Sequence, residues 1–277
     1  MMGMILPKKS MTEEDIKLQY ITPAVTSKWS RGKITMETPI TDGKINLKGN
    51  MVFREKPKRV DYLLYLSTNN PIAVIEAKDN NHTVSHGLQQ AMEYAKMLDL
   101  PFAFSSNGDG FAEHDFLTGT EREFGLDEFP TEAELTARFK QESGLCPAQG
   151  AAINQPYYSS QSTYPPRYYQ RIAINRTVDA IARGQQRLLL VMATGTGKTR
   201  TAISLVDVLQ RNNRVKNTLF LADRTSLVNQ AARNFAKLLP DTSITVLSDK
   251  NSEIDPNARI TFSTYQTMIN YVNTDEK

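Results

Sequence analysis

The residues Asp61, Glu76 and Lys78 are of the types that can hydrolyse a phosphodiester with the help of a metal ion. Glu76 and Lys78 follow the apolar run 72–75, at the carboxyl end of a predicted buried strand, and their spacing directs both side chains the same way. Asp61 lies on the preceding predicted strand, which can pair beside it. Two carboxylates can hold Mg²⁺, and an ammonium can position water or offset charge on the phosphate. The alternative is an exposed Glu–Lys pair on a surface strand.

A helix predicted over 85–98 follows these strands and carries Gln90 and Tyr94, whose i, i+4 spacing places them on one face. The pieces RVDYLLY, IEAK and QQAMEY together resemble the core of PD-(D/E)xK nucleases, with Val60 where the name of the motif has Pro. The Q-x-x-x-Y addition is a feature of the subgroup found in type I restriction enzymes, where it helps to hold the site and the DNA strand. The resemblance implies a magnesium site held by Asp61 and Glu76. It implies the catalytic set Asp61, Glu76, Lys78, Gln90 and Tyr94.

Other acids and histidines lie near this predicted site. Glu14, on the first predicted helix, is a candidate for the further acid that many such nucleases use, and Glu13 and Asp15 compete with it for that role. His82 and His86 have the i, i+4 spacing of a zinc pair, but no third ligand is evident nearby in the sequence. We therefore interpret them as loop histidines.

A second group of residues has the build of a phosphate cradle. The stretch VMATGTGKTRTA follows an apolar run, which predicts a strand over 187–192, a Gly-rich turn and a helix over 198–211. Backbone N–H groups of such a turn can surround a β-phosphate, while Lys198 bridges the β- and γ-phosphates and Thr199 places a hydroxyl on Mg²⁺. A flexible Gly/Thr loop is the alternative, which the flanking elements disfavour. The predicted ATP-binding loop comprises Thr194, Gly195, Thr196, Gly197, Lys198 and Thr199.

The octapeptide MATGTGKT at 192–199 resembles the phosphate loop of superfamily 2 helicases and translocases, particularly of restriction-enzyme motors. In those motors a glutamine that reads adenine precedes the loop, and Gln170 stands 28 residues before Lys198. The segments LFLADRTSLVNQ (219–230) and TFSTYQTM (261–268) resemble two strand-to-helix motifs that contact the DNA backbone. Each of these segments alone is also compatible with an ordinary strand–helix joint.

The chain divides into three predicted regions. Residues 1–130 are predicted as a nuclease domain, 131–166 as an acidic helix and a Gly/Pro/Ser/Gln-rich linker, and 167–277 as the first RecA-like motor domain, partial and built on a parallel sheet. The fold class is thus α/β throughout. In the first region the predicted elements are a helix capped by Ser10 or Thr12, and strands at 34–40, 45–53, 60–66, 71–77, 101–105 and 110–116. In the second half we predict helices at 168–183, 198–211 and 226–239, strands at 187–192, 217–222, 244–247 and 259–263, and a final helix.

A nuclease followed by such a motor is the order found in the restriction subunit of type I restriction–modification enzymes, whereas type III subunits place the nuclease after the motor. This resemblance implies double-stranded DNA, ATP, and partner subunits for methylation and sequence specificity. Two rival interpretations are a nuclease–helicase fusion of DNA repair or phage defence, and a catalytically silent DNA- and ATP-binding module. No acidic D-E-x-H strand follows TFSTYQTM, so we expect an N-terminal piece of a longer subunit without ATPase activity of its own.

Composition restricts the class of protein. The 277 residues suffice for two domains, the single cysteine (Cys146) excludes a disulfide framework, and no apolar run approaches membrane-spanning length. We therefore expect a cytoplasmic protein without a membrane segment. The net charge is only +3, yet residues 160–234 hold 12 Lys or Arg against 3 Asp or Glu, and residues 1–60 hold 12 against 6. Both basic regions are compatible with surfaces that meet phosphates.

Overall fold

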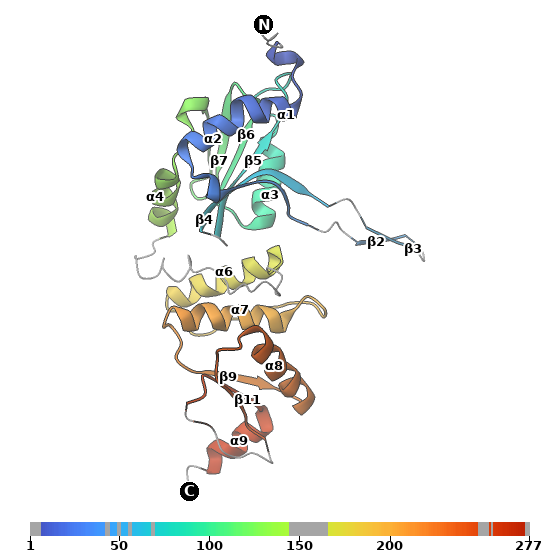
Figure 1. Cartoon of the computed structure of the whole chain (residues 1–277), viewed down its shortest axis with the longest axis vertical. Helices are drawn as coiled ribbons and strands as arrows, with labels where there is room; N and C mark the ends of the chain where they lie inside the picture. Colours follow the sequence, from blue (N-terminus) through green and yellow to red (C-terminus); the bar gives the residue numbers. More distant parts are fainter. Residues whose placement is uncertain are drawn as a thin grey trace. The chain divides into compact units, whose positions relative to one another are not determined.

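The structure is a computed structural model that describes residues 7–41, 45–48, 51–54, 57–67, 70–143, 166–248, 255 and 257–274. The chain forms two compact units, Met1–Gly150 and Ala151–Lys277, each of which is described by itself (Figure 1). Cys146 and almost all of the linker predicted at 146–166 lie outside the described residues. No helix in the described ranges is long and apolar enough to cross a membrane.

A six-stranded mixed sheet organises the first unit, in the order β1-β4-β5-β6-β7-β8. Only β5 and β6 pair in parallel, because the helix α3 (Leu88–Leu98) carries the chain from the end of one to the start of the other, whereas every other neighbouring pair is antiparallel. The strands are β1 (Ile34–Pro39), β4 (Arg59–Ser67), β5 (Asn70–Ala77), β6 (Phe102–Ser106), β7 (Gly110–Asp115) and β8 (Thr120–Gly125).

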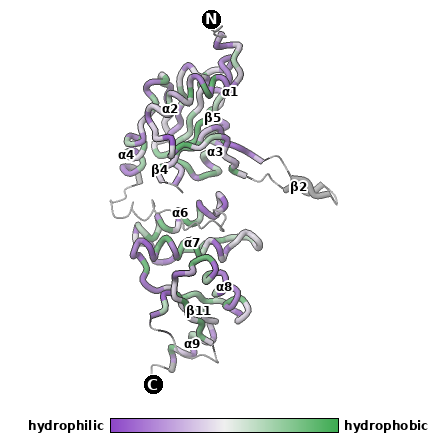
Figure 2. Tube along the Cα trace, viewed as in Figure 1, coloured by the Kyte–Doolittle hydropathy of each residue, from purple (hydrophilic) through white to green (hydrophobic). Residues whose placement is uncertain are grey.

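Helical segments cover both faces of this sheet. The N-terminal segment runs through α1 (Glu13–Ile16), a π-helical turn η2 (Lys17–Ile21) and α2 (Thr22–Lys28), and it buries Ile16 and Val25 against Tyr62 and Leu64. Leu63 lies between these two strand residues and so points to the opposite face, where α3 packs on β5 and β6. Figure 2 shows the apolar colour concentrated on the strands between the helices. Short 3₁₀ turns complete the unit: η1 (Lys8–Ser10), η3 (Arg31–Lys33) and η4 (Leu126–Glu128).

The acidic helix predicted near 131–142 is α4 (Glu132–Ser143), and it packs on the first unit. Leu135 is fully buried in the core cluster that contains Phe104 and Phe111, and Arg138 forms ion pairs of 2.6 Å with Glu113 and Asp115 of β7. From its acidic sequence this helix is expected at the surface, in the region that connects the two domains. In the structure its contacts join it to the sheet.

The single strand predicted over 45–53 is wrong. Residues 45–54 instead form an antiparallel pair, β2 (Ile45–Lys48) and β3 (Met51–Arg54). The sequence signal was available, since Gly-Asn stands between the short runs INLK and MVFR, and such a dipeptide favours a two-residue hairpin turn.

The second unit contains an all-parallel three-stranded sheet in the order β10-β11-β9, as the predicted helix–strand alternation requires. Its core joins Phe235 of one helix with Phe220 and Phe262 of the sheet. The centroids of these three rings are 5.1–5.9 Å apart. Helices α6 and α7 pack together through Ile174 and Val208. The elements are α6 (Tyr168–Ala182), α7 (Lys198–Arg211), β9 (Thr218–Ala222), α8 (Thr225–Leu238), β10 (Ile244–Val246), β11 (Ile260–Thr264) and α9 (Tyr265–Thr274).

The buried strand predicted over 187–192 is also wrong. These residues are described but have no strand structure, and the side chains of Leu189 and Val191 are 88% and 86% exposed. An apolar run indicates a preference for burial, but a strand also needs a neighbour for its backbone N–H and C=O groups. Within the described residues, β9, β10 and β11 pair only with one another.

Candidate functional sites

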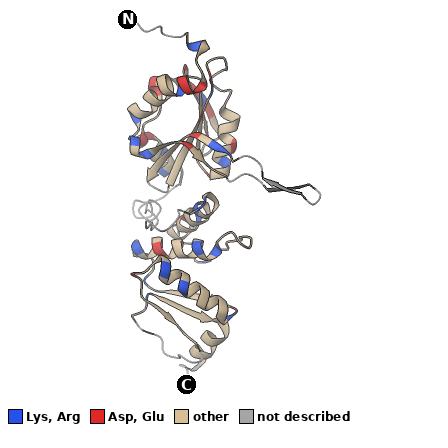
Figure 3. Cartoon of the chain, turned by 45° about the vertical axis from the view of Figure 1, so that its right-hand side comes forward, with Lys and Arg blue, Asp and Glu red and all other residues tan. Residues whose placement is uncertain are grey.

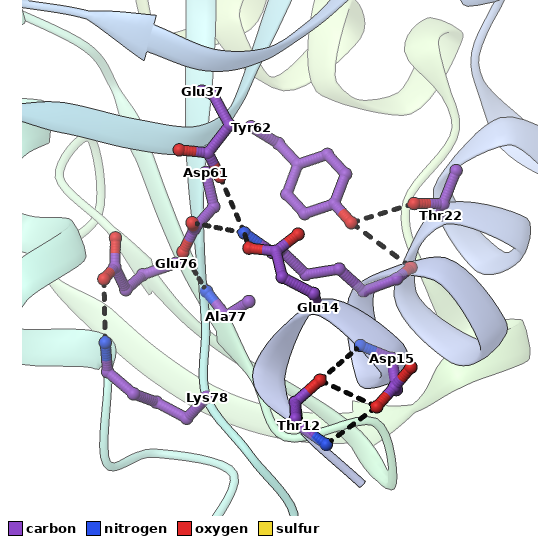
Figure 4. Close-up of polar contacts among 11 residues, drawn as sticks. Thr12, Glu14, Asp15, Thr22, Glu37, Asp61, Tyr62, Glu76, Ala77 and Lys78 are labelled. Atoms are coloured by element: carbon purple, nitrogen blue, oxygen red, sulfur yellow. Dashed lines mark hydrogen bonds and ion pairs between the residues drawn. The ribbon is translucent and has the colours of Figure 1, made fainter.

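The first site lies where β4 and β5 separate. Their backbone pairing runs up to Tyr62 and Ile75, so Asp61 and Glu76 are the next residues on each strand. Asp61 bridges the gap with its side chain, because the Ala77 N–H donates to Asp61 Oδ2 at 2.7 Å. Figure 4 shows the Asp61 and Glu76 carboxylates beside each other at this point. Asp61 is 8% exposed and Glu76 only 4%.

Glu76 has one oxygen without a partner. Lys78 Nζ donates to Glu76 Oε1 at 2.8 Å, whereas the buried Oε2 has no hydrogen-bond partner among the described residues. Burial, and secondly the charge of Asp61, raises the pKa of Glu76 to about 7. A buried carboxylate oxygen without a donor, next to a second carboxylate, has the donor set that Mg²⁺ prefers. The two residues therefore fit the magnesium ion expected from the sequence.

Lys78 links this pair to the helix α3. Its ammonium also donates to Gln90 Oε1 at 3.3 Å, and Gln90 Nε2 in turn donates to the Tyr94 hydroxyl at 2.9 Å. Burial would lower the pKa of Lys78, but the hydrogen bond and charge of Glu76 outweigh it and the pKa is raised. The structure thus brings together all five residues that the sequence assigned to this site.

The N-terminus of α1 adds an acid to the same region. Thr12 caps this helix in a reciprocal box with Asp15, which occupies the Asp15 carboxylate. Burial, then repulsion from Asp61, raises the pKa of Glu13, whereas Glu14 forms a 2.5 Å ion pair with Lys17. Of the three acids considered from the sequence, Glu13 is therefore the one whose charge interacts with the carboxylate pair.

Sequence reasoning missed two residues that contact this site. Lys17 is 2% exposed, and its Nζ lies 3.1 Å from Asp61 Oδ1 and 2.6 Å from Glu37 Oε1. A lysine on a helix with acids in its first turn is common, and nothing in the sequence shows that residues 44 positions apart meet. Figure 4 shows Glu14, Glu37 and Asp61 converging, with dashed lines to one ammonium.

The two histidines stack on each other rather than forming a ligand set. The ring centroids of His82 and His86 are 4.1 Å apart, and the Asp79 carboxylate lies 3.9 Å from His82 Nε2. No group of three or more His, Cys, Asp or Glu side chains placed to hold a metal occurs in the part of the chain that the structure describes. Interpreting them as loop histidines agrees with these contacts.

The second site is the loop before α7. Gly195 and Gly197 have φ values of +76° and +83°, in the left-handed region that favours glycine, and Gly197 is the N-cap of the helix. A Cβ at position 197 would lie only 2.5 Å from Gln170 Nε2. The loop therefore depends on glycine twice, for its backbone angle and for its close approach to α6.

Gln170 holds this loop from the neighbouring helix. It is 4% exposed, its Nε2 donates to the Thr196 carbonyl at 2.8 Å, and its Oε1 accepts from the Arg167 N–H at 2.9 Å. The Tyr169 hydroxyl donates to the same carbonyl of Thr196 at 3.2 Å. The structure thus places Gln170 at the loop, as the sequence predicts, with its amide bonded within the chain.

Lys198 begins α7 and turns back over the loop, where its Nζ donates to the carbonyls of Met192 and Ala193 at 3.3 and 3.2 Å. Thr199 follows on the first turn of the helix. The first N–H groups of a helix lack intrahelical partners, and together with the helix dipole they favour an anion at this end. The loop of residues 194–199 fits a nucleotide phosphate on these grounds.

The two strand-to-helix segments of the second unit meet at one sheet edge. β9 and β11 are parallel neighbours, with Thr264 opposite Ala222, so the turns that follow them lie side by side. One turn presents Arg224, whose side chain is 78% exposed, and the other leads to Tyr265, which is 56% exposed. Figure 3 shows Lys and Arg along the helices of this unit.

Each of the two units matches a known protein family. Residues 27–130 match the family described as the N terminus of the type I restriction enzyme R protein (HSDR_N), and residues 163–277 match the family described as the type III restriction enzyme res subunit. Shorter similarity, 33% identity over 92 residues, extends to UvrABC system protein B of Tropheryma whipplei, covering 33% of this chain and 13% of that protein.

Longer similarities cover both units. The chain is 41% identical over 265 residues to the endonuclease subunit of the type I restriction enzyme EcoAI of Escherichia coli, covering 94% of this chain and 32% of that protein. It is 31% identical to the EcoKI endonuclease subunit of Escherichia coli K12, covering 63% of this chain and 18% of that one. A solved HsdR fragment of a type I restriction enzyme from Vibrio vulnificus YJ016 superposes with a TM-score of 0.80 at 34% identity, covering 95% of this chain and 49% of that chain. The chain thus spans about a third or less of the two curated relatives. By sequence and by fold, it belongs with the N-terminal region of the R (HsdR) subunits of type I restriction enzymes.

Proposed function

We propose that this chain carries the nuclease site and the ATP-binding loop of a type I restriction subunit, which cuts unmethylated foreign DNA. The observation that carries the nuclease assignment is the buried carboxylate pair at the separation of β4 and β5, in which Glu76 Oε2 lacks a partner. Its arrangement with Lys78, Gln90 and Tyr94 supports the assignment to the PD-(D/E)xK nucleases. The 94% coverage by similarity to one type I endonuclease subunit supports restriction rather than repair.

In this proposal Asp61 and Glu76 hold Mg²⁺, which when bound supplies a Lewis acid for the phosphodiester and an activated water. Asp61 is fixed by the Ala77 N–H, so its position does not depend on the ion. Lys78 stands within hydrogen-bond distance of Glu76 and balances negative charge that grows on the scissile phosphate. Gln90 and Tyr94 orient Lys78 from α3 and contact the DNA strand.

The second unit is proposed as the first RecA-like domain of an ATP-dependent translocase on double-stranded DNA. Residues 194–199 surround the phosphates, Lys198 exchanges its two backbone carbonyls for the β- and γ-phosphates, and Thr199 binds the accompanying Mg²⁺. Gln170 reads adenine while it supports the loop. The turns after β9 and β11 contact the DNA backbone from one edge of the sheet.

The domain limits 1–130, 131–166 and 167–277 remain a proposal, as do the partners. The EcoAI and EcoKI proteins are endonuclease subunits of type I enzymes. We infer from this membership that the chain acts with methylation and specificity subunits, and that the specificity subunit chooses the DNA sequence.

The proposal is tested in a complete restriction assembly that contains this chain. Asp61→Asn and Lys78→Met are each expected to lower Mg²⁺-dependent cleavage of an unmethylated plasmid by about 100-fold or more, since each removes a ligand or a charge stabiliser. Glu93→Gln, which removes an exposed carboxylate of α3 outside the proposed catalytic set, is the matched control. If the Asp61→Asn assembly cleaved the plasmid at the parental rate, this centre would not be the nuclease site. That result would favour the catalytically silent DNA- and ATP-binding module instead.

A further inference from the structure

The ammonium of Lys17 lies inside the nuclease unit among three carboxylates. Its Nζ is 2.5 Å from Glu14 Oε1, 2.6 Å from Glu37 Oε1 and 3.1 Å from Asp61 Oδ1, and the residue is 2% exposed. Burial would lower the pKa of Lys17, but its hydrogen bonds to these three carboxylates outweigh that effect and raise the pKa well above its usual range. These three contacts place a lysine ammonium on the side of Asp61 that faces away from Ala77.

Two backbone irregularities bring this group together. Lys17 begins the π-helical turn that interrupts the N-terminal helix, and such turns are frequent at functional sites. Glu37 has φ +49° although it lies in β1, at the register position opposite Asp61 between the pairs Met36–Tyr62 and Thr38–Val60. A strained position persists where the surroundings fix it, and here the strained Glu37 directs its carboxylate to the same ammonium that contacts Asp61.

The contacts of Lys17 leave space for one divalent cation beside Asp61 and Glu76, because its ammonium fills the other side of Asp61. The carboxylates outnumber the ammonium groups, and Glu76 Oε2, which has no partner among the described residues, would be the oxygen open to one divalent ion. A further divalent ion at Asp61 would have to lie among the oxygens that now surround Lys17 Nζ, where it would meet a like charge at contact distance. The carboxylates of this region belong to Asp61, Glu76, Glu13, Glu14 and Glu37.

We propose that Lys17 occupies the position of a second metal ion, so that the nuclease centre binds a single divalent cation. This inference rests on the proposed metal-dependent nuclease. The ammonium forms ion pairs with Asp61, Glu14 and Glu37, the carboxylates that a two-metal site would assign to the second ion. Because the ammonium is covalently attached, its share of the positive charge at this site does not depend on free Mg²⁺.

The first experiment counts bound Mn²⁺ on the 277-residue chain by electron paramagnetic resonance, without nucleotide. The difference between the parental chain and Asp61→Asn gives the number of ions that depend on Asp61. We expect one ion. Two ions lost on Asp61→Asn would overturn the inference and leave the proposed metal centre intact, whereas no ion lost would overturn the metal centre itself and the inference with it. This count needs no substitution at Lys17, so it holds even if Lys17 variants do not fold.

The second experiment removes the ammonium. Lys17→Ala opens the space between the three carboxylates, and Glu14 and Glu37 can move inward because their side chains are 74% and 47% exposed. The Asp61-dependent count is then expected to rise from one to two. Lys17→Met, which fills the same space without charge, is expected to stay at one, and so is Lys17→Ala combined with Glu14→Ala.

The control for loss of charge is Lys33→Ala, which breaks the ion pair of Lys33 with Glu132 elsewhere in the unit. It is expected to leave the count at one. A thermal midpoint that Mn²⁺ raises more in Lys17→Ala than in the parental chain would support the new site independently, since a ligand stabilises the state that binds it. A count of one in a folded Lys17→Ala chain would overturn the inference.

Discussion

The carboxylates of Asp61 and Glu76 have different roles in the proposed site because their oxygens have different hydrogen-bond partners. Both oxygens of Asp61 are engaged, one by Lys17 and one by the Ala77 N–H. Glu76 has one oxygen bonded to Lys78 and one buried without a partner among the described residues. Asp61 is thus a fixed ligand, whereas Glu76 is the group whose protonation responds to pH and to a bound cation.

The protonation of Glu76 links the stability of the metal-free unit to pH. Its folded pKa of about 7 lies above the ordinary 4.5, so the folded state binds the proton more tightly and stability is lost as pH rises from about 4.5 to 7. We expect Glu76→Gln to be more stable than the parental chain by about 2 kcal/mol at pH 8, with the difference shrinking toward pH 5. Urea unfolding in EDTA, followed by fluorescence of the single, buried Trp29, measures this.

Glu93→Gln, at an exposed position of α3, is the control and should not change the pH dependence. Equal pH slopes for Glu76→Gln and the parental chain would show that Glu76 does not titrate in this range.

A bound divalent ion must displace the proton from Glu76. Near pH 7 about half of the metal-free chains carry that proton, so binding is expected to release roughly half a proton per ion and to weaken as pH falls below 7. Calorimetric titration of Mn²⁺ in buffers of different ionisation enthalpy measures the release, with Lys198→Ala as the background for the other unit. Proton release that persists in Glu76→Gln would assign the effect to a different group.

At the scale of elements, the phosphate loop depends on the helix packed beside it. Gly197→Ala places a Cβ 2.5 Å from Gln170 Nε2 and keeps φ at +83°, so the bond from Gln170 to the Thr196 carbonyl must break or the loop must move. We expect ATP affinity to fall about tenfold, from about 1–2 kcal/mol of backbone and hydrogen-bond loss. Fluorescent nucleotide binding measures it.

Gly184→Ala separates the two causes. Gly184 has a similar φ of +86° but open space around its Cβ position, and it lies outside the loop. It should therefore leave ATP affinity unchanged while costing stability. If both variants bound ATP equally well, the close contact between α6 and the loop would not matter.

Sequence patterns predicted elements where the signal is local. The boundaries of α7 were predicted correctly, because the Gly-rich turn and the amphipathic pattern mark both of its ends. The strand at 187–192 was not, because strand formation depends on a distant partner. The same limit applies to the site: Glu76, Lys78, Gln90 and Tyr94 lie within one short segment, whereas Lys17 and Glu37 reach it only through the folded chain.

At the scale of the whole molecule, the two proposed sites lie in different compact units. The carboxylate site is built entirely from residues 13–94 and the phosphate loop entirely from residues 167–199, in different compact units. We expect Lys198→Ala to abolish ATP binding while leaving Mn²⁺ binding at Asp61 unchanged, and Asp61→Asn to do the reverse. Paired titrations of both ligands on both variants measure this, and a Mn²⁺ affinity that shifts in Lys198→Ala would show coupling between the units.

The bond from the Ala77 N–H to Asp61 also makes one backbone proton an internal probe. The Ala77 N–H donates its hydrogen bond to the Asp61 carboxylate instead of to a backbone carbonyl of the neighbouring strand, at the point where β4 and β5 separate. When a cation draws electron density from that carboxylate, the bond weakens, so the Ala77 amide resonance should shift upfield and its exchange with deuterium should quicken. A single nuclear magnetic resonance peak in a labelled chain can thus follow the charge state of the centre without substrate, cleavage or any substitution.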